Sequence, residues 1–292
     1  MRGKIVLAGL VLVISAGVAS AQGTVGAPYP TDVNCSGIVT TEQPSRDTYV
    51  ITGEQSNYQV VFDQTDYVYI NAGQNKGVKE GDEYFVIRPV TDSVREEWTK
   101  WQFSILNQMG TVWEDEARLK VVVVRGKVSI AQVEHLCDYV QRGDIVLPFE
   151  ERPMPPLKSE DQFERFARPS GKPLAMVITS KKFEPEAGTN DIVYVNLGSA
   201  QGVKVGDYFR IFRYQGVEHE TPYLTHRFAF DVDGDWGPTL GLGSSPSKWN
   251  WTNVPREILG EGIVLRTGPN SSTVLITLSL REVFAGDYVE ME

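Results

Sequence analysis

The sequence has few of the side chains that carry most acid–base and metal chemistry, with three histidines and two cysteines among 292 residues. It contains no G-x-S-x-G motif, no metalloprotease helix and no glycine-rich loop that leads into a helix, so the common hydrolase and phosphate-binding sites are not indicated. Basic residues are also few, because 28 Lys and Arg stand against 38 Asp and Glu. Nucleic-acid-binding proteins need a basic surface, so this balance argues against a nucleic-acid partner. We therefore expect no enzyme and no cofactor.

Long apolar runs are absent after the first residues of the chain. Arg2 and Lys4 precede the run IVLAGLVLVISAGV, and small residues follow at Ala19 and Ala21. This pattern is typical of a secretory signal peptide over residues 1–21. An uncleaved membrane anchor is the alternative, but the run is short for a span of about 20 residues. We expect an exported protein that does not span a membrane after cleavage and whose 26 basic and 38 acidic residues give a formal charge of −12.

The two cysteines, Cys35 and Cys137, both lie in the first half of the chain. In an oxidising, exported compartment an even number of cysteines favours one disulfide. Two buried free thiols are the alternative. A bridge between them would join the first strand of the first domain to its last, and a loop of this length would contribute about 4 kcal/mol to stability.

One segment of the sequence occurs twice. DYVYINAGQNKGVKEGDEYFVIR at 66–88 aligns without a gap with DIVYVNLGSAQGVKVGDYFRIFR at 191–213, with 11 identities in 23 positions. Later in each unit, Gly143-Asp144 corresponds to Gly286-Asp287 before a final strand. We interpret the pattern as an internal duplication of a unit made of strand, turn, strand, variable insertion and further strands.

The runs between the turns are rich in β-branched and aromatic residues, which favour strands. Five or six short antiparallel strands in each unit predict a small closed barrel or sandwich, because a flat sheet would leave two exposed edges. The fold class is therefore mainly all-β, with two tandem modules. The expected segments are a flexible leader at 22–32, β-barrel module 1 at 33–149, a proline-rich acidic linker at 150–172 and β-barrel module 2 at 173–292.

The repeated phrase predicts structural turns and no reactive site. Asn71 and Gly73 are expected at positions that tolerate positive φ, and Gly77 at a second left-handed position. Gly81 is expected in a tight turn, with Asp82 accepting backbone N–H groups at the start of the next strand. The equivalent residues of the second unit are Asn196, Gly198, Gly202, Gly206 and Asp207.

The insertions differ between the two units. In the first, Val94, Trp98, Trp101 and Ile105 recur at helical spacing behind a Thr-Asp-Ser cap and predict a short helix. The second insertion is loop-like and rich in glycine. Its tryptophans are candidates for a contact surface: Trp236, Trp249 and Trp251.

A weak candidate metal site lies in the same insertion, where DVDGDW resembles the start of a calcium loop. Asp231, Asp233 and Asp235 have the right spacing, but Leu242 stands where such a loop needs a bidentate glutamate. A plain Asx-rich turn is the alternative, and we expect no metal.

The phrase VY[IV]N-x-G-x-x-x-GVK-x-GD, together with a late strand that contains GDYV, resembles the C-terminal β-barrel module of the flagellar assembly protein T family and related exported proteins of Gram-negative bacteria. The resemblance implies a barrel fold, a place in the periplasm or outer envelope, and no catalytic residues. This chain differs from that family in carrying two copies of the module. The interpretation that follows is a non-catalytic envelope scaffold that acts through contacts with other envelope proteins. One alternative is a cell-wall module that binds peptidoglycan glycan through the loop tryptophans, and a less favoured one is an exported hydrolase.

Overall fold

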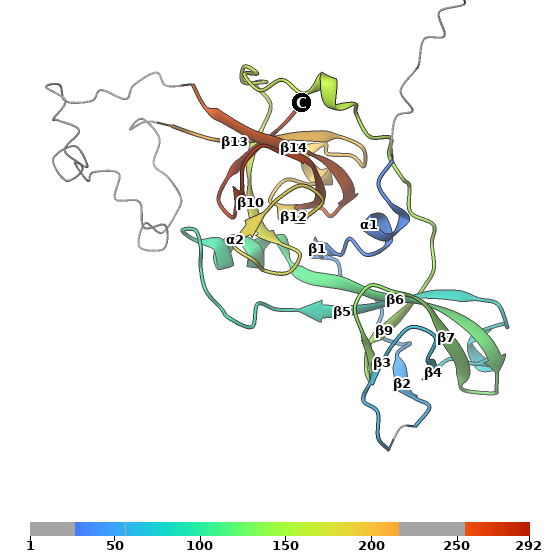
Figure 1. Ribbon diagram of the computed structural model, residues 1–292. Helices are drawn as coiled ribbons and strands as arrows, with labels where there is room; N and C mark the ends of the chain where they lie inside the picture. The colour runs from blue at the N-terminus through green and yellow to red at the C-terminus, as the bar shows by residue number, and fades with distance from the viewer. Residues whose placement is uncertain (1–26, 56, 216–254) are drawn as a thin grey trace, which may run out of the picture.

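The computed structural model describes residues 27–55, 57–215 and 255–292, which form mainly antiparallel strands (Figure 1). A curled seven-stranded sheet makes the first module and a closed six-stranded barrel makes the second. The described residues also contain two α-helices, α1 (Pro30–Asn34) and α2 (Gln102–Met109). The predicted fold class, two small β modules with a short helix in the first, is confirmed.

The two modules repeat one strand order, in which every strand of the first except β1 has an equivalent in the second. The first sheet has the order β2-β4-β7-β6-β5-β9, with β1 paired to β6, and the barrel has the order β10-β12-β15-β14-β13-β17. The elements of the first module are β1 (Ile38–Thr40), β2 (Val50–Gly53), β3 (Val61–Phe62), β4 (Tyr67–Ile70), the 3₁₀ turn η1 (Gln74–Lys76), β5 (Glu83–Val90), β6 (Thr111–Val124), β7 (Ser129–Leu136), β8 (Val140–Gln141) and β9 (Ile145–Pro148). Those of the linker and second module are η2 (Glu160–Gln162), β10 (Leu174–Ser180), β11 (Glu186–Ala187), β12 (Ile192–Val195), η3 (Ser199–Gln201), β13 (Tyr208–Arg213), β14 (Glu257–Thr267), β15 (Ser272–Ser279), β16 (Val283–Phe284) and β17 (Tyr288–Met291).

The first sheet curls until its two end strands meet. The N–H of Val50 donates to the carbonyl of Asp144 at 2.9 Å, and the N–H of Gly143 donates to the carbonyl of Val50 at 2.8 Å. Each module therefore encloses its own apolar core, formed by the inward side chains of alternating residues. Such closure removes exposed strand edges, which are a risk for aggregation.

The same arginine–aspartate pair closes both modules. Arg88 on β5 binds Asp144 through Nε and Nη2, both at 2.8 Å, and Arg213 on β13 binds Asp287 in the same way at 2.7 Å. Each aspartate also accepts the backbone N–H three residues before it. A bidentate pair of this kind fixes the geometry of the Gly-Asp turn as well as its charge.

Two glycines of each repeated turn adopt a left-handed backbone. Gly77 and Gly81 have φ angles of 76° and 91°, in the left-handed region that glycine adopts without strain. Asp82 Oδ2 accepts the N–H of Lys79 at 2.8 Å, and Asp207 does the same for Lys204. The glycines Gly202 and Gly206 repeat these conformations, with φ angles of 89° and 92°.

The prediction of positive φ at Asn71 and Gly73, and at Asn196 and Gly198, is wrong. Gly73 is extended, with φ −145°, and a Cβ atom there would lie 2.3 Å from the carbonyl oxygen of Arg125. Gly198 is equally close to the carbonyl of Gly268. Close backbone approach therefore requires glycine here. The asparagine acts through its side chain, since Oδ1 of Asn71 and of Asn196 each accepts a backbone N–H at 2.7 Å from the neighbouring strand.

The helix of the first insertion begins later than its apolar spacing predicts. Val94, Trp98 and Trp101 lie before α2, and only Ile105 of the predicted stripe is helical. Trp101 is the N-cap, with a left-handed φ of 63°, and 71% of its side chain is exposed. Helix α2 instead packs its own residues, including Met109, against the second module. Contacts with the second module, which is distant in the sequence, therefore determine which part of the insertion becomes helical.

The predicted disulfide is present between Cys35 and Cys137, which are 102 residues apart. It joins the residue after α1 to the residue after β7, and not the first strand to the last as expected. Residues 30–32 of the expected leader form the first turn of α1. The predicted signal peptide lies outside the described residues. None of the helices within the described ranges is long and apolar enough to cross a membrane.

Replacing Cys35 and Cys137 together by serine should lower the free energy of unfolding by about 4 kcal/mol, because the unfolded chain would regain the freedom of a loop of about 100 residues. Urea unfolding of the oxidised protein and of the double variant measures the difference. Adding a reducing agent should lower the urea midpoint of the oxidised protein and leave that of the double variant unchanged. Equal stability of the two proteins would contradict the prediction.

Candidate functional site

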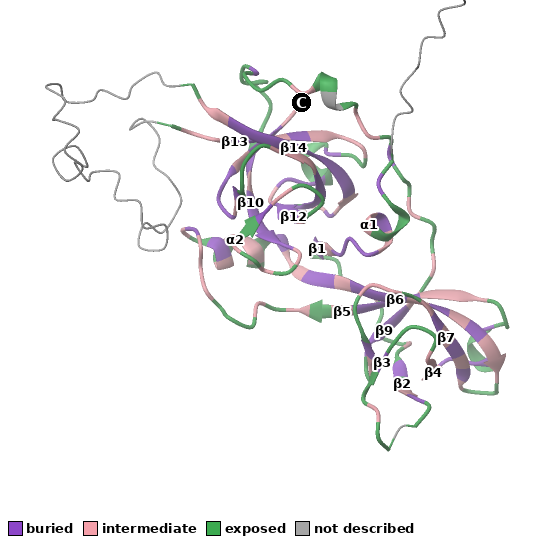
Figure 2. Ribbon diagram, viewed as in Figure 1, coloured by how far each residue is buried: buried purple, intermediate pink, exposed green. Residues whose placement is uncertain are grey.

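The two modules meet through a packed junction that includes α1, β1 and α2 (Figure 1). Val39 and Met109 of the first module pack against Ile178 and Tyr194 of the second. The side chain of Gln102 donates to the carbonyl of Ile178 at 2.7 Å. Much of β6 and of the barrel strands is buried (Figure 2). A buried, apolar and hydrogen-bonded junction holds the modules in one relative orientation.

A single carboxylate connects four parts of the chain at this junction. Asp115 on β6 accepts two hydrogen bonds from Arg152 of the linker, at 2.7 and 2.8 Å, and one from Arg266 on β14 at 3.3 Å. It also accepts the N–H of Gly37 at 2.9 Å. Arg152 Nη1 further donates to the carbonyls of Val33 and Asn34. The Asp115 cluster, defined as Asp115, Arg152 and Arg266, thus ties together β6, the N-terminal segment, the linker and the barrel.

The electrostatics of the Asp115 cluster favour the ionised carboxylate. Burial alone would raise the pKa of Asp115, but hydrogen bonds from Arg152 and the charge of Arg266 outweigh it and hold this pKa below its usual range. Burial also lowers the pKa of Arg266, although Asp115 opposes that change. The cluster is therefore a satisfied buried salt bridge, of the kind that is costly to break by removing one partner.

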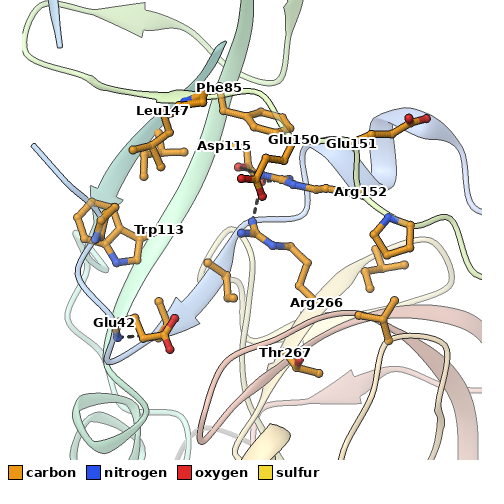
Figure 3. A pocket seen from close by; sticks show the side chains of 18 of the residues that line it. Glu42, Phe85, Trp113, Asp115, Leu147, Glu150, Glu151, Arg152, Arg266 and Thr267 are labelled. Atoms are coloured by element: carbon orange, nitrogen blue, oxygen red, sulfur yellow. Dashed lines mark hydrogen bonds and ion pairs between the residues drawn. The ribbon is translucent and has the colours of Figure 1, made fainter. Parts of the chain in front are cut away.

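A cleft of about 710 Å³ opens beside this cluster, between the two modules (Figure 3). Its first-module wall includes Phe85, Ile87, Trp113 and Leu147. The second-module wall comes from Val205, in the repeated turn, and from β14. The lining also includes Glu42, Pro44, Pro148, Glu150, Glu151 and Pro153.

The charges of the cleft are divided between its floor and its rim. Arg152 and Arg266 are engaged by Asp115. The rim carboxylates, defined as Glu42, Glu150 and Glu151, are exposed, and no ion pair holds them within the described residues. The charge that this cleft offers to solvent is therefore negative.

A second buried carboxylate, Glu116, lies next to Asp115 and has different surroundings. It is fully buried, and neither carboxylate oxygen has a hydrogen-bond partner among the described residues. Its ion-pair partner is Arg88, whose Nη1 lies 3.4 Å away. Burial raises the pKa of Glu116 to about 8; Arg88 opposes this rise, while Asp144, Glu114 and Asp138 add to it. Burial thus favours the neutral form of Glu116 near pH 7, whereas the charge of Arg88 favours the ionised form.

The second module has no charge at the position of Glu116. Glu116 lies at the register shift between β5 and β6, and Leu259 lies at the matching shift between β13 and β14. Leu259 is buried in the barrel core. The adjacent Asp115 corresponds to Ile258. The two charges are therefore additions to a site that a copy of the same module fills with hydrocarbon.

Some residues singled out from the sequence lie elsewhere, and others lie outside the described residues. The repeated turn of the first module is away from the cleft lining, whereas Val205 of the second lines it. The contact candidates Trp236, Trp249 and Trp251 and the acidic triplet Asp231, Asp233 and Asp235 lie outside the described residues. Within residues 27–55, 57–215 and 255–292, no three His, Cys, Asp or Glu side chains are grouped to hold a metal ion.

Sequence reasoning missed Asp115, Arg152, Arg266 and Glu116. One signal was available, because Glu114-Asp115-Glu116 interrupts an otherwise alternating strand and places charge on both of its faces. The arginine partners carried no such signal.

Comparison of the sequence with models of known protein families and with curated protein sequences finds no match. The resemblance to the flagellar assembly protein T module therefore stays a prediction.

Asp115→Asn should lower the free energy of unfolding by about 3 kcal/mol at neutral pH, because it leaves two guanidinium groups without their charge partner. Because the pKa of Asp115 is depressed in the folded state, the wild-type advantage is present above the unfolded value, near 4, and is lost as the pH falls through the folded value. Urea unfolding over a pH series measures both effects. Asp161→Asn, at an exposed linker position, is the control and should match wild type.

Glu116→Leu should stabilise the protein, and the gain should grow as the pH rises from about 4.5 toward about 8. In that range the unfolded chain releases a proton that the folded chain retains, so the wild type loses up to about 1.4 kcal/mol of stability for each pH unit. Glu80→Val is the matched control, since it also introduces the residue of the second module but in an exposed turn. A gain that is independent of pH would contradict the assignment.

Proposed function

We propose that the chain is a non-catalytic scaffold of the bacterial cell envelope, exported and acting through contacts with other envelope proteins. The observation that carries the proposal is the locked junction with its open cleft. The charged groups at the centre of that junction, Asp115, Arg152 and Arg266, are bound to one another and to the backbone. They therefore stabilise the relative orientation of the modules and leave a recognition surface of fixed shape beside them.

The disulfide supports the exported part of the proposal. Structural disulfides form and persist in oxidising compartments, and Cys35–Cys137 links the N-terminal segment to the first module. Lys181 of the second module also donates to the carbonyl of Cys35, so the bridged segment contributes to the junction. A covalent tie at this position suits a protein that must keep its form outside the cytoplasm.

Chemical cross-linking in intact cells that make the protein, followed by mass spectrometry, tests the scaffold. We expect reproducible cross-links to one or a few envelope proteins, and fewer of them in cells that carry Asp115→Asn, because a loosened junction changes the surface. Asp161→Asn is again the matched control. Recovery of no protein partner would overturn the proposal. Cosedimentation of the protein with purified cell wall, lost in Trp236→Ala or Trp249→Ala, would instead favour glycan binding.

A further inference from the structure

One outer face of the second module is covered by the chain itself. The face is formed by β13, β14 and β17 and carries Arg210, Glu261, Glu290 and Glu292. Lys158 of the linker crosses it, with its Nζ 2.6 Å from Glu261 and 2.8 Å from Glu292. Further along, the N–H of Ser170 donates to Glu290 at 3.2 Å. Residues 158–170 therefore lie as a covering segment over this face.

The corresponding face of the first module has a different chemistry. By the strand register, Arg210 corresponds to Phe85, Glu290 to Leu147 and Glu292 to Phe149. Phe85 belongs to an apolar cluster with Ile87, Trp113 and Ile145, against which Leu147 and Phe149 pack. Arg152 covers part of it, with its guanidinium carbon 4.0 Å from the centre of the Phe85 ring. Phe85 and Leu147 also form part of the cleft wall.

The surroundings of the cleft define what would bind there. Its rim carries the carboxylates Glu42, Glu150 and Glu151, and its floor arginines are already paired with Asp115. Three prolines of the lining, Pro44, Pro148 and Pro153, have no backbone N–H, so they disfavour the addition of a strand by main-chain pairing. Recognition would depend on side chains.

We propose that the cleft binds an extended segment of a partner protein in which an apolar side chain is followed by lysine or arginine. The apolar side chain lies against Leu147 and Val205, accessible apolar residues of the two walls, and the cation meets the rim carboxylates. This inference rests on the proposed function and names the site and the partner chemistry for it. A volume of about 710 Å³ has room for such side chains, since pockets of about 300–1,000 Å³ bind ligands.

The second module offers a parallel in form only, because a linker segment that includes Lys158 covers its equivalent face. The carboxylates that Lys158 binds, Glu261 and Glu292, correspond to Arg118 and Phe149 of the first module, so the rim carboxylates are what the cation would meet here.

Selection of linear peptides from a phage-displayed library on the purified protein tests the site. We expect the selected peptides to carry an apolar residue close to a basic one. Fluorescence anisotropy with the selected peptides then compares two double variants of equal charge change. Glu150→Lys with Glu151→Lys should weaken binding by about tenfold or more, because it reverses the charge of the rim. Glu184→Lys with Glu186→Lys, at exposed positions beside a separate hollow in the second module, should leave it within about twofold.

Selected peptides that are acidic, or that bind both double variants equally, would overturn the assignment of the cleft. Light scattering could also show that the molar mass doubles as the concentration rises and that the rim variant does not dimerise. This result would assign the cleft to a second copy of this chain and would overturn the proposal of a partner peptide. These results are separable from failure of the scaffold. Cross-links in cells to an envelope partner, unchanged by the rim variant, would keep the scaffold and reject the cleft as its site.

Discussion

The interaction between Asp115 and its two arginines is the contact on which the junction depends. The carboxylate is on the longest strand of the first module, and its partners come from the linker and from the barrel. Removing such a charge from water is costly, so the position is stable only because the guanidiniums and the N–H of Gly37 together satisfy it. Loss of either arginine would leave Asp115 incompletely paired, so the contacts of the Asp115 cluster stabilise one another cooperatively. Modules joined only by a linker would sample many orientations, whereas these two share a buried centre.

The two copies keep the features that make the fold and differ at the features that join them. Both retain the left-handed glycines of the turn and the bidentate arginine–aspartate pair, such as Arg88 with Asp144. They diverge in the middle of one strand, where Asp115 and Glu116 correspond to Ile258 and Leu259. Asp115 points to the junction and is satisfied there. Glu116 lies at a core position beside Arg88, and neither of its carboxyl oxygens has a hydrogen-bond partner among the described residues, so it carries a cost that the second module does not have.

The sequence was sufficient for features whose cause is local. Gly77 and Gly81 adopt left-handed backbone because the turn requires it, and alternation with β-branched residues predicted the strands. The side chain of Asn71 accepts a hydrogen bond from a neighbouring strand, and α2 begins where it packs against the second module. Both depend on contacts distant in the sequence, so local patterns predicted them wrongly. The centre of the candidate site was out of reach for the same reason. The partners of Asp115 are 37, 78 and 151 residues away in the chain, and nothing in a single sequence pairs residues at such separations.

The shape of the cleft and the stability of the junction are physically linked. Apolar outer surface costs free energy in water at about 25 cal/mol per Å² until something covers it, and in the first module Arg152 covers Phe85 but leaves Leu147 half-buried. The second module solves this problem with charge and a covering segment of its own chain, whereas the first leaves part of its apolar face as one wall of a cleft. The other wall belongs to the barrel, so the width of the cleft is set by how firmly the modules are held. A recognition surface divided between two modules keeps one specificity only if the contact between those modules is rigid, and the Asp115 cluster supplies that rigidity.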